Sequence, residues 1–285
     1  MKRTLIALIA LAGALVAAIA LADIRGTWTI EKSSRHDDRV QLNLSREHNN
    51  FGSTFLLSSF TGLSLADGAS NFELRAEAGT VRFDGTFRDG DGAGHFTFTP
   101  NSAFVNTLRS MNVPGIGEVD DEKLLELALH GVSTDFIRSM RAEGYDVTLD
   151  KYVGMRIFNV TPAVIQELRT LGFDRLKYDD LIASRIHGVT PEFIRKMAAL
   201  GYHHIDLDDL VAFRIHGVTP EFVKELSDLG YHNVDSDDLV AMRIHGVTPK
   251  FIRELKDAGY EGVPVDKLVS MRIHGIDAAF IRKVK

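Results

Sequence analysis

The chain has 285 residues, with 33 Lys and Arg against 39 Asp and Glu, and its formal net charge at pH 7 is −6. It contains no cysteine, which excludes disulfide scaffolds, thiolate zinc sites, iron–sulfur clusters and thiol nucleophiles. Apolar residues make up 45% of the chain and charged residues 25%, which predicts a globular protein with room for two domains. The mild acidity argues against a dedicated binder of DNA or of anionic membranes, since such surfaces need clustered Lys and Arg.

Residues 1–22 have the pattern of a secretory signal peptide. Lys2 and Arg3 precede an apolar run from Leu5 to Ala22 that ends in Ala-Leu-Ala. We expect cleavage near Ala22 and a periplasmic or secreted bacterial protein. The alternative is an uncleaved anchor, because 18 apolar residues are at the lower limit for spanning a bilayer. In that case this segment would be the only membrane contact that we expect.

Residues 23–111 alternate in the manner of β-strands. Apolar residues recur at every second position in several short segments, with Thr, Ser, Asn and Arg between them. Turn signals at Ala78-Gly79 and in the glycine-rich segment 88–94 separate the last three of these segments, which predicts consecutive hairpins. We expect an antiparallel sandwich or barrel of about six or seven strands.

Two short motifs in this domain resemble ligand sites. Gly26-Thr27-Trp28 resembles the opening of lipocalins, whose barrels carry small apolar ligands, and Asp89-Gly90-Asp91-Gly92 resembles part of a calcium loop. A lipocalin needs about eight strands, and a calcium loop needs a third oxygen ligand and a terminal Glu. We therefore expect Trp28 to close a small core and the Asp-Gly segment to form a hairpin turn.

Residues 121–285 form a tandem repeat with a period of 29 residues, after a linker at 112–120 that contains Pro and Gly. The copies begin at Glu122, Asp150, Asp179, Asp208, Asp237 and Asp266. A fixed period of this size predicts stacked units that share one core. The expected fold class is therefore α+β with two domains, in which the β-domain is followed by an α-solenoid of six helix-turn-helix units.

Each unit is expected to contain two short helices joined by a tight turn. An Asp begins the first helix, a His and a Gly end it, and a Thr followed by Pro begins the second. In the three most regular copies these residues are Asp179, Asp208 and Asp237; His187, His216 and His245; Gly188, Gly217 and Gly246; and Thr190, Thr219 and Thr248. The second copy has Asn159 in place of the Gly, and Asn also tolerates the left-handed conformation.

One histidine recurs in five of the six copies. The column comprises His130, His187, His216, His245 and His274, and the second copy has Phe158 instead. Units stacked ~8–10 Å apart cannot bring these imidazoles within ~2.1 Å of one zinc ion. We therefore expect structural histidines near helix ends, and no metal site.

A column of arginines has two interpretations. It comprises Arg156, Arg185, Arg214, Arg243 and Arg272, and the same copies carry Asp150, Asp179, Asp208, Asp237 and Asp266. We favour an Arg–Asp ladder between successive units, because the first helix is otherwise nearly all apolar. The alternative is a basic strip that holds an anionic partner. The candidate partner-binding residues are Arg185, Arg214 and Arg243, with His203, His204 and His232 after the second helices.

The sequence has no recognisable catalytic or cofactor-binding motif. It lacks a His-Glu-x-x-His pair, a Gly-x-Ser-x-Gly elbow, a phosphate loop and a dinucleotide glycine pattern. We therefore expect no cofactor and no enzyme activity. The segment Ile-His-Gly-Val-Thr-Pro resembles the helix-hairpin-helix element that binds DNA phosphates, but Thr replaces its second glycine. Because the chain is also acidic, nucleic acid is a disfavoured partner.

A family resemblance covers most of the expected mature chain. Gly-Ala-Gly-His-Phe-Thr-Phe-Thr-Pro-Asn at 92–101, followed by Arg-Ile-His-Gly-Val-Thr-Pro repeats, resembles regions appended to bacterial membrane metallopeptidases of the β-lactam-sensor, antirepressor type. This sequence lacks their zinc motif, so peptidase activity is not implied. The resemblance implies an extracytoplasmic sensing or interaction module. We expect an exported, non-enzymatic protein that binds a protein or cell-envelope component through its repeats. The alternatives are an envelope hydrolase and a carrier of small apolar ligands.

Overall fold

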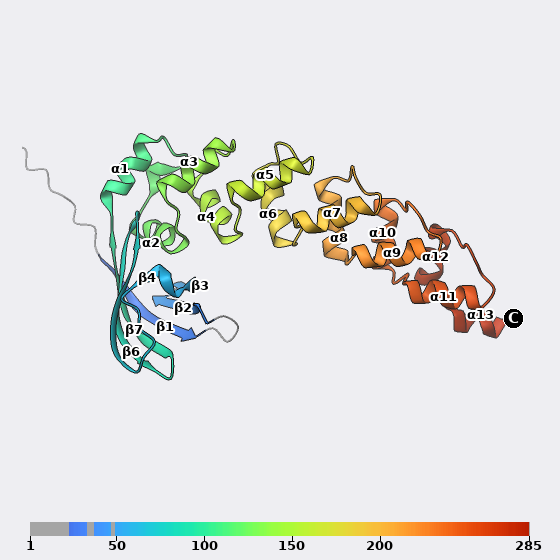
Figure 1. The fold of residues 1–285 in the computed structure, drawn as a ribbon, viewed down its shortest axis with the longest axis horizontal. Helices are drawn as coiled ribbons and strands as arrows, with labels where there is room; N and C mark the ends of the chain where they lie inside the picture. Colours follow the sequence, from blue (N-terminus) through green and yellow to red (C-terminus); the bar gives the residue numbers. More distant parts are fainter. Residues whose placement is uncertain (1–22, 33–36, 47–48, 285) are drawn as a thin grey trace, which may run out of the picture. The chain divides into compact units, whose positions relative to one another are not determined.

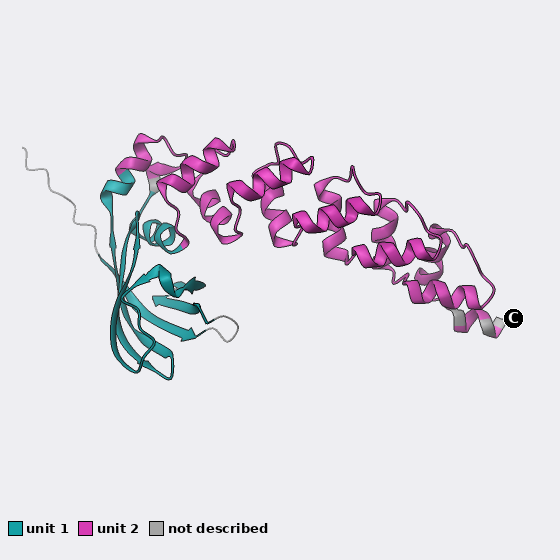
Figure 2. Ribbon diagram, viewed as in Figure 1, with its two compact units in different colours: residues 1–105, 119–129 teal, residues 106–118, 130–285 magenta. Residues whose placement is uncertain are grey.

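The computed structural model describes residues 23–32, 37–46 and 49–284. The predicted signal peptide, residues 1–22, lies outside the described residues. Contacts divide the chain into two compact units, residues 1–105 with 119–129 and residues 106–118 with 130–285 (Figure 2).

The first unit contains one antiparallel sheet of seven strands that curls into half a barrel (Figure 1). The strands are β1 (Ile24–Lys32), β2 (Arg39–Arg46), β3 (Asn49–Leu56), β4 (Phe60–Thr61), β5 (Gly68–Ala76), β6 (Gly79–Arg88) and β7 (Asp91–Pro100), with the order β3-β2-β1-β7-β6-β5-β4. The predicted antiparallel β-domain is confirmed, but a sandwich is wrong because the described strands form one sheet. The reason is that β1 pairs with both β2 and β7, which joins the early and late strands edge to edge.

Two hairpin turns of this sheet lie where the sequence predicts them. β5 and β6 are joined at Glu77-Ala78, and β6 and β7 are joined at Asp89-Gly90. Asp89 and Gly90 have φ values of 54° and 89°, as a type I′ turn requires at both central positions. The Asp-Gly segment is therefore a hairpin turn.

Trp28 lies in the core of the sheet, as predicted, and is 1% exposed. Its ring meets Phe72 edge-on, with the centroids 5.2 Å apart, and its Nε1 donates to the Asp84 carbonyl at 3.1 Å. A Cβ at Gly85 would lie 2.7 Å from the indole, so only glycine fits there. Trp28 is thus held by aromatic packing and by the hydrogen bond of its indole N–H.

The helix α2 (Asp121–His130) belongs to the compact unit of the sheet, although the sequence places it at the start of the repeats. Its Glu122 forms an ion pair with Arg46 on β2. Its buried residues are Leu124, Leu125, Leu127, Ala128 and Leu129. This division differs from the expected boundary after the linker at 112–120, because residues 119–129 belong to the unit that contains the β-domain.

The second unit contains a row of short helix pairs (Figure 1). Besides α2 and the short η1 (Leu57–Ser59) of the first unit, the described helices are α1 (Ser102–Ser110), η2 (Ile116–Glu118), α3 (Thr134–Ala142), α4 (Leu149–Ile157), α5 (Pro162–Thr170), α6 (Tyr178–Ile186), α7 (Pro191–Ala199), α8 (Leu207–His216), α9 (Pro220–Asp228), α10 (Ser236–Ile244), α11 (Pro249–Asp257), α12 (Val265–Ile273) and α13 (Ala278–Val284). The first helices of the pairs, from α4 to α12, begin 29 residues apart and pack against their neighbours in the row.

The second helices begin as the sequence predicts. Thr190 caps α7 by accepting a hydrogen bond from the Phe193 amide at 3.1 Å. Thr219 and Thr248 cap α9 and α11 in the same way, at 3.2 and 3.1 Å. Pro follows each Thr at the first helical position, where its missing amide hydrogen costs nothing.

The turns between the helices are also confirmed, with one refinement at the start of the first helix. Gly188, Gly217 and Gly246 have φ values between 70° and 74°, and Asn159 has a φ of 52°. The recurrent acids Asp179, Asp208 and Asp237 lie inside the first turn of their helices, after N-cap residues Lys177, Asp206 and Asp235. These carboxylates therefore meet the helix dipole from within the helix rather than as caps.

Candidate partner-binding surface

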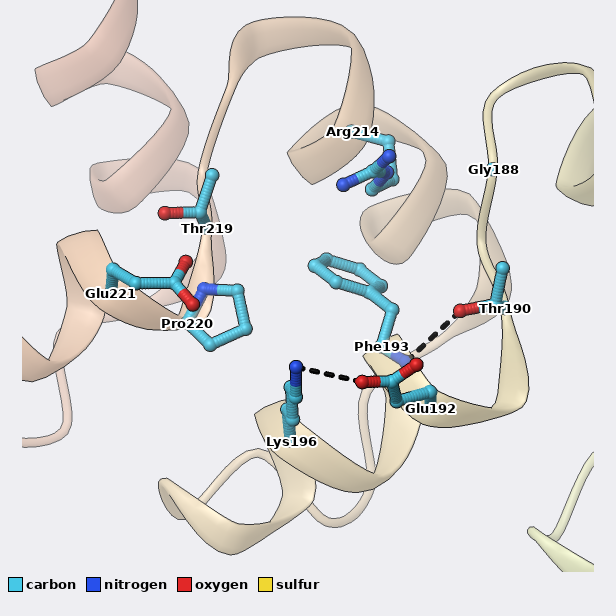
Figure 3. Close-up of a pocket in the computed structure, with 9 residues that line it drawn as sticks. All are labelled: Gly188, Thr190, Glu192, Phe193, Lys196, Arg214, Thr219, Pro220 and Glu221. Atoms are coloured by element: carbon cyan, nitrogen blue, oxygen red, sulfur yellow. Dashed lines mark hydrogen bonds and ion pairs between the residues drawn. The ribbon is translucent and has the colours of Figure 1, made fainter. Parts of the chain in front are cut away.

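The recurrent Arg side chains join successive 29-residue repeats. Arg214 on α8 donates through Nε to the His187 carbonyl at 3.1 Å, and its guanidinium lies 5.1 Å from the centroid of the Phe193 ring (Figure 3). The other Nε bonds are Arg156 to His130, Arg185 to Phe158 and Arg243 to His216, at 3.0, 2.9 and 3.4 Å. Arg156, Arg243 and Arg272 stack on Phe136, Phe222 and Phe251. Arg156, Arg214 and Arg243 therefore contact both helices of the preceding pair, whereas among the described residues Arg185 has the carbonyl bond alone and Arg272 has the ring contact alone.

The acceptor for these arginines is a backbone carbonyl, so the predicted Asp partner is wrong for Arg185, Arg214 and Arg243. Within α8, six residues separate Asp208 from Arg214, which corresponds to ~9 Å along the helix axis. Asp208 therefore lies near the start of α8, whereas Arg214 is near its end. Carbonyls at a helix end have no partner inside the helix, and the guanidinium satisfies one of them. The arginines therefore still form a ladder between successive repeats, but its acceptors are backbone carbonyls and not Asp side chains.

The His column contributes its backbone rather than its ring to this ladder. Phe158, the one exception in the column, offers the same carbonyl to Arg185 as the histidines do. The rings of His216 and His245 are exposed, and His274 Nδ1 is 2.8 Å from the Ser270 carbonyl. No group of three potential metal ligands occurs among the described residues.

The three loop histidines lie on the surface. His203 and His204 are exposed beside a hollow of about 320 Å³ that Asn233 and Asp235 also line. His232 is exposed, and its Nδ1 is 2.9 Å from Ser227 Oγ. These residues are available to a partner. His203 and His232 share one repeat position, but that position is acidic in the other copies, at Asp146, Asp174 and Glu261.

An exposed isoleucine, which the sequence analysis did not single out, recurs at the end of every first helix from α4 to α12. We call these five side chains the Ile strip: Ile157, Ile186, Ile215, Ile244 and Ile273. They are between 52% and 57% exposed. The helical period could have revealed them, because Phe213 and Ile215 are ~200° apart around α8 and cannot both face the core. Phe213 is buried, and Ile215 is left in solvent.

The surroundings of the Ile strip are apolar and basic. In α8, Ile215 stands between exposed Arg214 and His216, while half-buried Val211 and Ala212 lie one turn earlier on its side of the helix. The acidic residue Asp208 lies nearly two turns away, near the other end of the helix. The edge of the row at the ends of the first helices therefore presents isoleucines flanked by cationic and imidazole side chains.

In the first copy, the equivalent of the Ile strip is buried. Leu129 on α2 occupies the same repeat position and is only 7% exposed, inside the compact unit that contains the sheet. The position is therefore compatible with burial wherever another surface covers it.

Where the second helices α7 and α9 meet, lysines occupy the positions that form an ion pair between the neighbouring second helices. Between these neighbours, Arg195 pairs with Glu167 at 2.5 Å and Arg253 pairs with Glu225 at 3.4 Å. Lys196 and Lys224 occupy the corresponding positions between α7 and α9. Each pairs with an acid of its own helix, and the hydrogen bond that Lys196 donates to Glu192 raises the pKa of that lysine. A hollow of about 230 Å³ lies beside Lys196, Phe193 and Arg214 (Figure 3).

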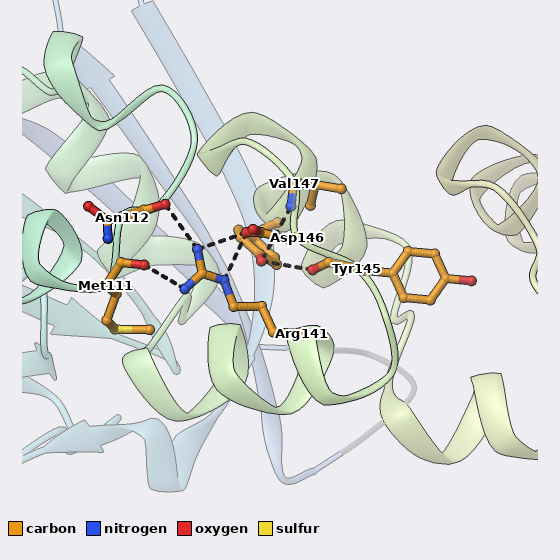
Figure 4. A network of polar contacts seen from close by, with 7 residues as sticks. Met111, Asn112, Arg141, Tyr145, Asp146 and Val147 are labelled. Atoms are coloured by element: carbon orange, nitrogen blue, oxygen red, sulfur yellow. Dashed lines mark hydrogen bonds and ion pairs between the residues drawn. The ribbon is translucent and has the colours of Figure 1, made fainter.

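A second polar network is structural. Arg141 donates to the Met111 and Asn112 carbonyls at 2.7 and 3.2 Å and pairs with Asp146 (Figure 4). The Tyr145 hydroxyl donates to the Leu176 carbonyl at 2.7 Å in the next unit. Tyr202 and Tyr231 donate to the Val234 and Val263 carbonyls at 2.6 and 2.7 Å in the same way. Burial raises the pKa of all three phenols, which keeps them protonated as donors.

No protein-family model matches the chain, and no curated protein matches it. Within the described residues, none of the helices has the length and apolarity needed to cross a membrane.

Proposed function

We propose that this protein is an exported, non-enzymatic binding module whose Ile strip contacts a protein or cell-envelope partner. In this proposal the helix pairs form an α-solenoid of six 29-residue units. Such rows offer long surfaces because every unit presents the same helix end. The signal-peptide pattern of residues 1–22 and the resemblance to extracytoplasmic sensor regions support export.

The observation that carries the proposal is the repetition of exposed isoleucine in five units. An isoleucine left in water forgoes the ~1.5–3 kcal/mol that full burial of such a side chain supplies. The exposed Asp column recurs as well, but exposure alone does not fix a residue type. For example, the second residue of the second helix is Glu192, Glu221 or Lys250. A position that stays Ile without entering the core is best explained by a surface that covers it.

Paired surface variants test this proposal. In the first variant, Ile186, Ile215 and Ile244 are each replaced by Asn. In the matched variant, Ala199, Lys250 and Asp257 are replaced by Asn, which changes three exposed side chains on the second helices. Envelope components cross-linked to the unmodified protein are identified and purified, and their affinity for both variants is measured.

The proposal requires the partner to lose affinity for the Ile variant and to keep it for the second-helix variant, while both variants unfold at the wild-type midpoint. Equal affinity for the Ile variant and the unmodified protein would show that the strip is not the contact surface. Export is tested separately by sequencing the N-terminus of the periplasmic protein, which we expect to begin at Asp23. A chain that retains Met1 in the cytoplasm would contradict this part of the proposal.

A further inference from the structure

We propose that the partner of the Ile strip is an acidic amphipathic α-helix that lies across the row of first helices. This inference rests on the proposed function and specifies the chemistry of the partner. It follows from the spacing of the isoleucines, from the charges beside them and from the exclusion of two other occupants.

The spacing favours a helix. Successive first helices pack against one another, and packed helix axes are commonly ~8–10 Å apart. Seven residues of an α-helix rise ~10.5 Å and return to nearly the same face, so one apolar residue in seven can meet each isoleucine. In an extended strand the same distance takes about three residues, which places successive contacts on opposite faces. Polyproline helices are usually bound by aromatic grooves, whereas this strip is aliphatic.

The charges favour an acidic partner. Every isoleucine of the strip follows an Arg in the sequence, and four of the five precede a His. Arg214 uses Nε for the His187 carbonyl and one face for the Phe193 ring, yet its side chain stays exposed. Its terminal nitrogens can therefore meet carboxylates beside an apolar contact.

The same charges disfavour two other occupants. A second copy of the chain pairing strip to strip would place Arg and His against Arg and His, because a two-fold interface repeats the same patch. An anionic bilayer would meet a chain of net charge −6 that carries Asp179, Asp208 and Asp237 on the same helices. Asp208 lies seven residues before Ile215, ~10.5 Å along the axis of α8, so a narrow helix on the strip is closer to Arg214 than to this aspartate.

The test uses the full exported chain and a labelled synthetic helix of about 28 residues, long enough to cross four intervals of ~10 Å. Leu and Ala form its apolar face and Glu flanks that face. A second peptide has Lys at every Glu position. Binding is followed by fluorescence anisotropy at low and high salt. Vesicles of phosphatidylglycerol and sedimentation of the protein alone provide the comparisons with a membrane and with a second copy.

We expect the Glu peptide to bind and salt to weaken it. The Lys peptide should bind at least ~10-fold more weakly, and replacing both Ile215 and Ile244 by Asn should weaken the Glu peptide by at least ~10-fold. Replacing the exposed Lys250 and Asp257 of the second helix α11 by Asn should leave binding unaltered. Equal binding of the two peptides, strip-dependent vesicle binding, or a dimer that the Ile variant abolishes would overturn the inference. If a captured partner depends on the strip but the Glu peptide does not bind, the proposed function stands and the acidic helix is wrong.

Discussion

The guanidinium of Arg214 lies over the ring of Phe193, with 5.1 Å between its Cζ and the ring centroid. The ring belongs to the second helix of one pair, and the arginine belongs to the first helix of the next. Arg214 also donates to the His187 carbonyl, at the end of the preceding first helix. Arg214 thus links its own helix α8 to α6 and α7 of the preceding pair.

Replacing Arg214 by Met should destabilise the protein by about 1–2 kcal/mol. The variant loses a charge-assisted hydrogen bond and a partly exposed cation–π contact, and it leaves the helix end without its donor. Urea unfolding followed by circular dichroism measures the change. A midpoint equal to that of the unmodified protein would show that these contacts of Arg214 contribute nothing to stability.

Arg185 provides a matched control, because it makes the carbonyl bond to Phe158 while Val164 occupies the position of the aromatic ring. We expect Arg185→Met to cost less than Arg214→Met by about 0.5–1 kcal/mol, the usual value of an exposed cation–π contact. Equal costs would assign the whole effect to the carbonyl bond.

Gly217→Ala should destabilise the protein by about 1–2 kcal/mol, because the left-handed conformation disfavours a Cβ. Gly217 has a φ of 74°, and an added Cβ would lie 3.0 Å from Arg243 Nη2. Gly217→Asn should cost less, since Asn159 already occupies the equivalent turn in the second copy. The two variants are compared by thermal unfolding, and an Asn variant as unstable as the Ala variant would argue against this reading of the turn.

Local features of the repeat were predictable, whereas their partners across units were not. The Thr190 cap and the left-handed Gly188 depend on neighbours within a few residues, so the sequence shows them directly. The acceptor of Arg214 lies 27 residues earlier, and no local pattern distinguishes a carbonyl from a carboxylate. The pairing of β1 with β7, which makes one sheet instead of two, is likewise non-local. The Ile strip was not singled out because each Ile lies beside the more conspicuous Arg and His columns, although its angle around the helix excludes it from the core.

The tyrosine bonds between units should make stability fall in alkali. Burial raises the pKa of Tyr145, Tyr202 and Tyr231, so the folded protein keeps these protons at a pH where the unfolded chain has lost them. The contribution is fully present below the unfolded pKa of about 10 and is lost as the pH rises from there through the higher folded value. Urea midpoints between pH 8 and pH 11 measure this loss.

A variant with Phe at all three tyrosine positions is the control for alkaline unfolding, because Phe173 occupies the equivalent position in the second copy without a hydroxyl. It should be less stable at neutral pH, since three carbonyls lose their donors, and it should lose less stability above pH ~10. An alkaline loss as steep as that of the unmodified protein would assign the effect to other groups.

Substitution by Ala at one repeat position should have a large effect on stability in one copy and a small effect in another. Leu129 is 7% exposed and Ile215 is 54% exposed, although both lie at the end of a first helix, just before the His that recurs between repeats. Leu129→Ala should cost about 2–5 kcal/mol, because it removes buried methyl groups and leaves a cavity. Ile215→Ala should stay within about 0.5 kcal/mol, as surface substitutions usually do. If Ile215→Ala were as costly as Leu129→Ala in urea unfolding, the isoleucine would already be covered within the chain, and it would not be free to receive a partner.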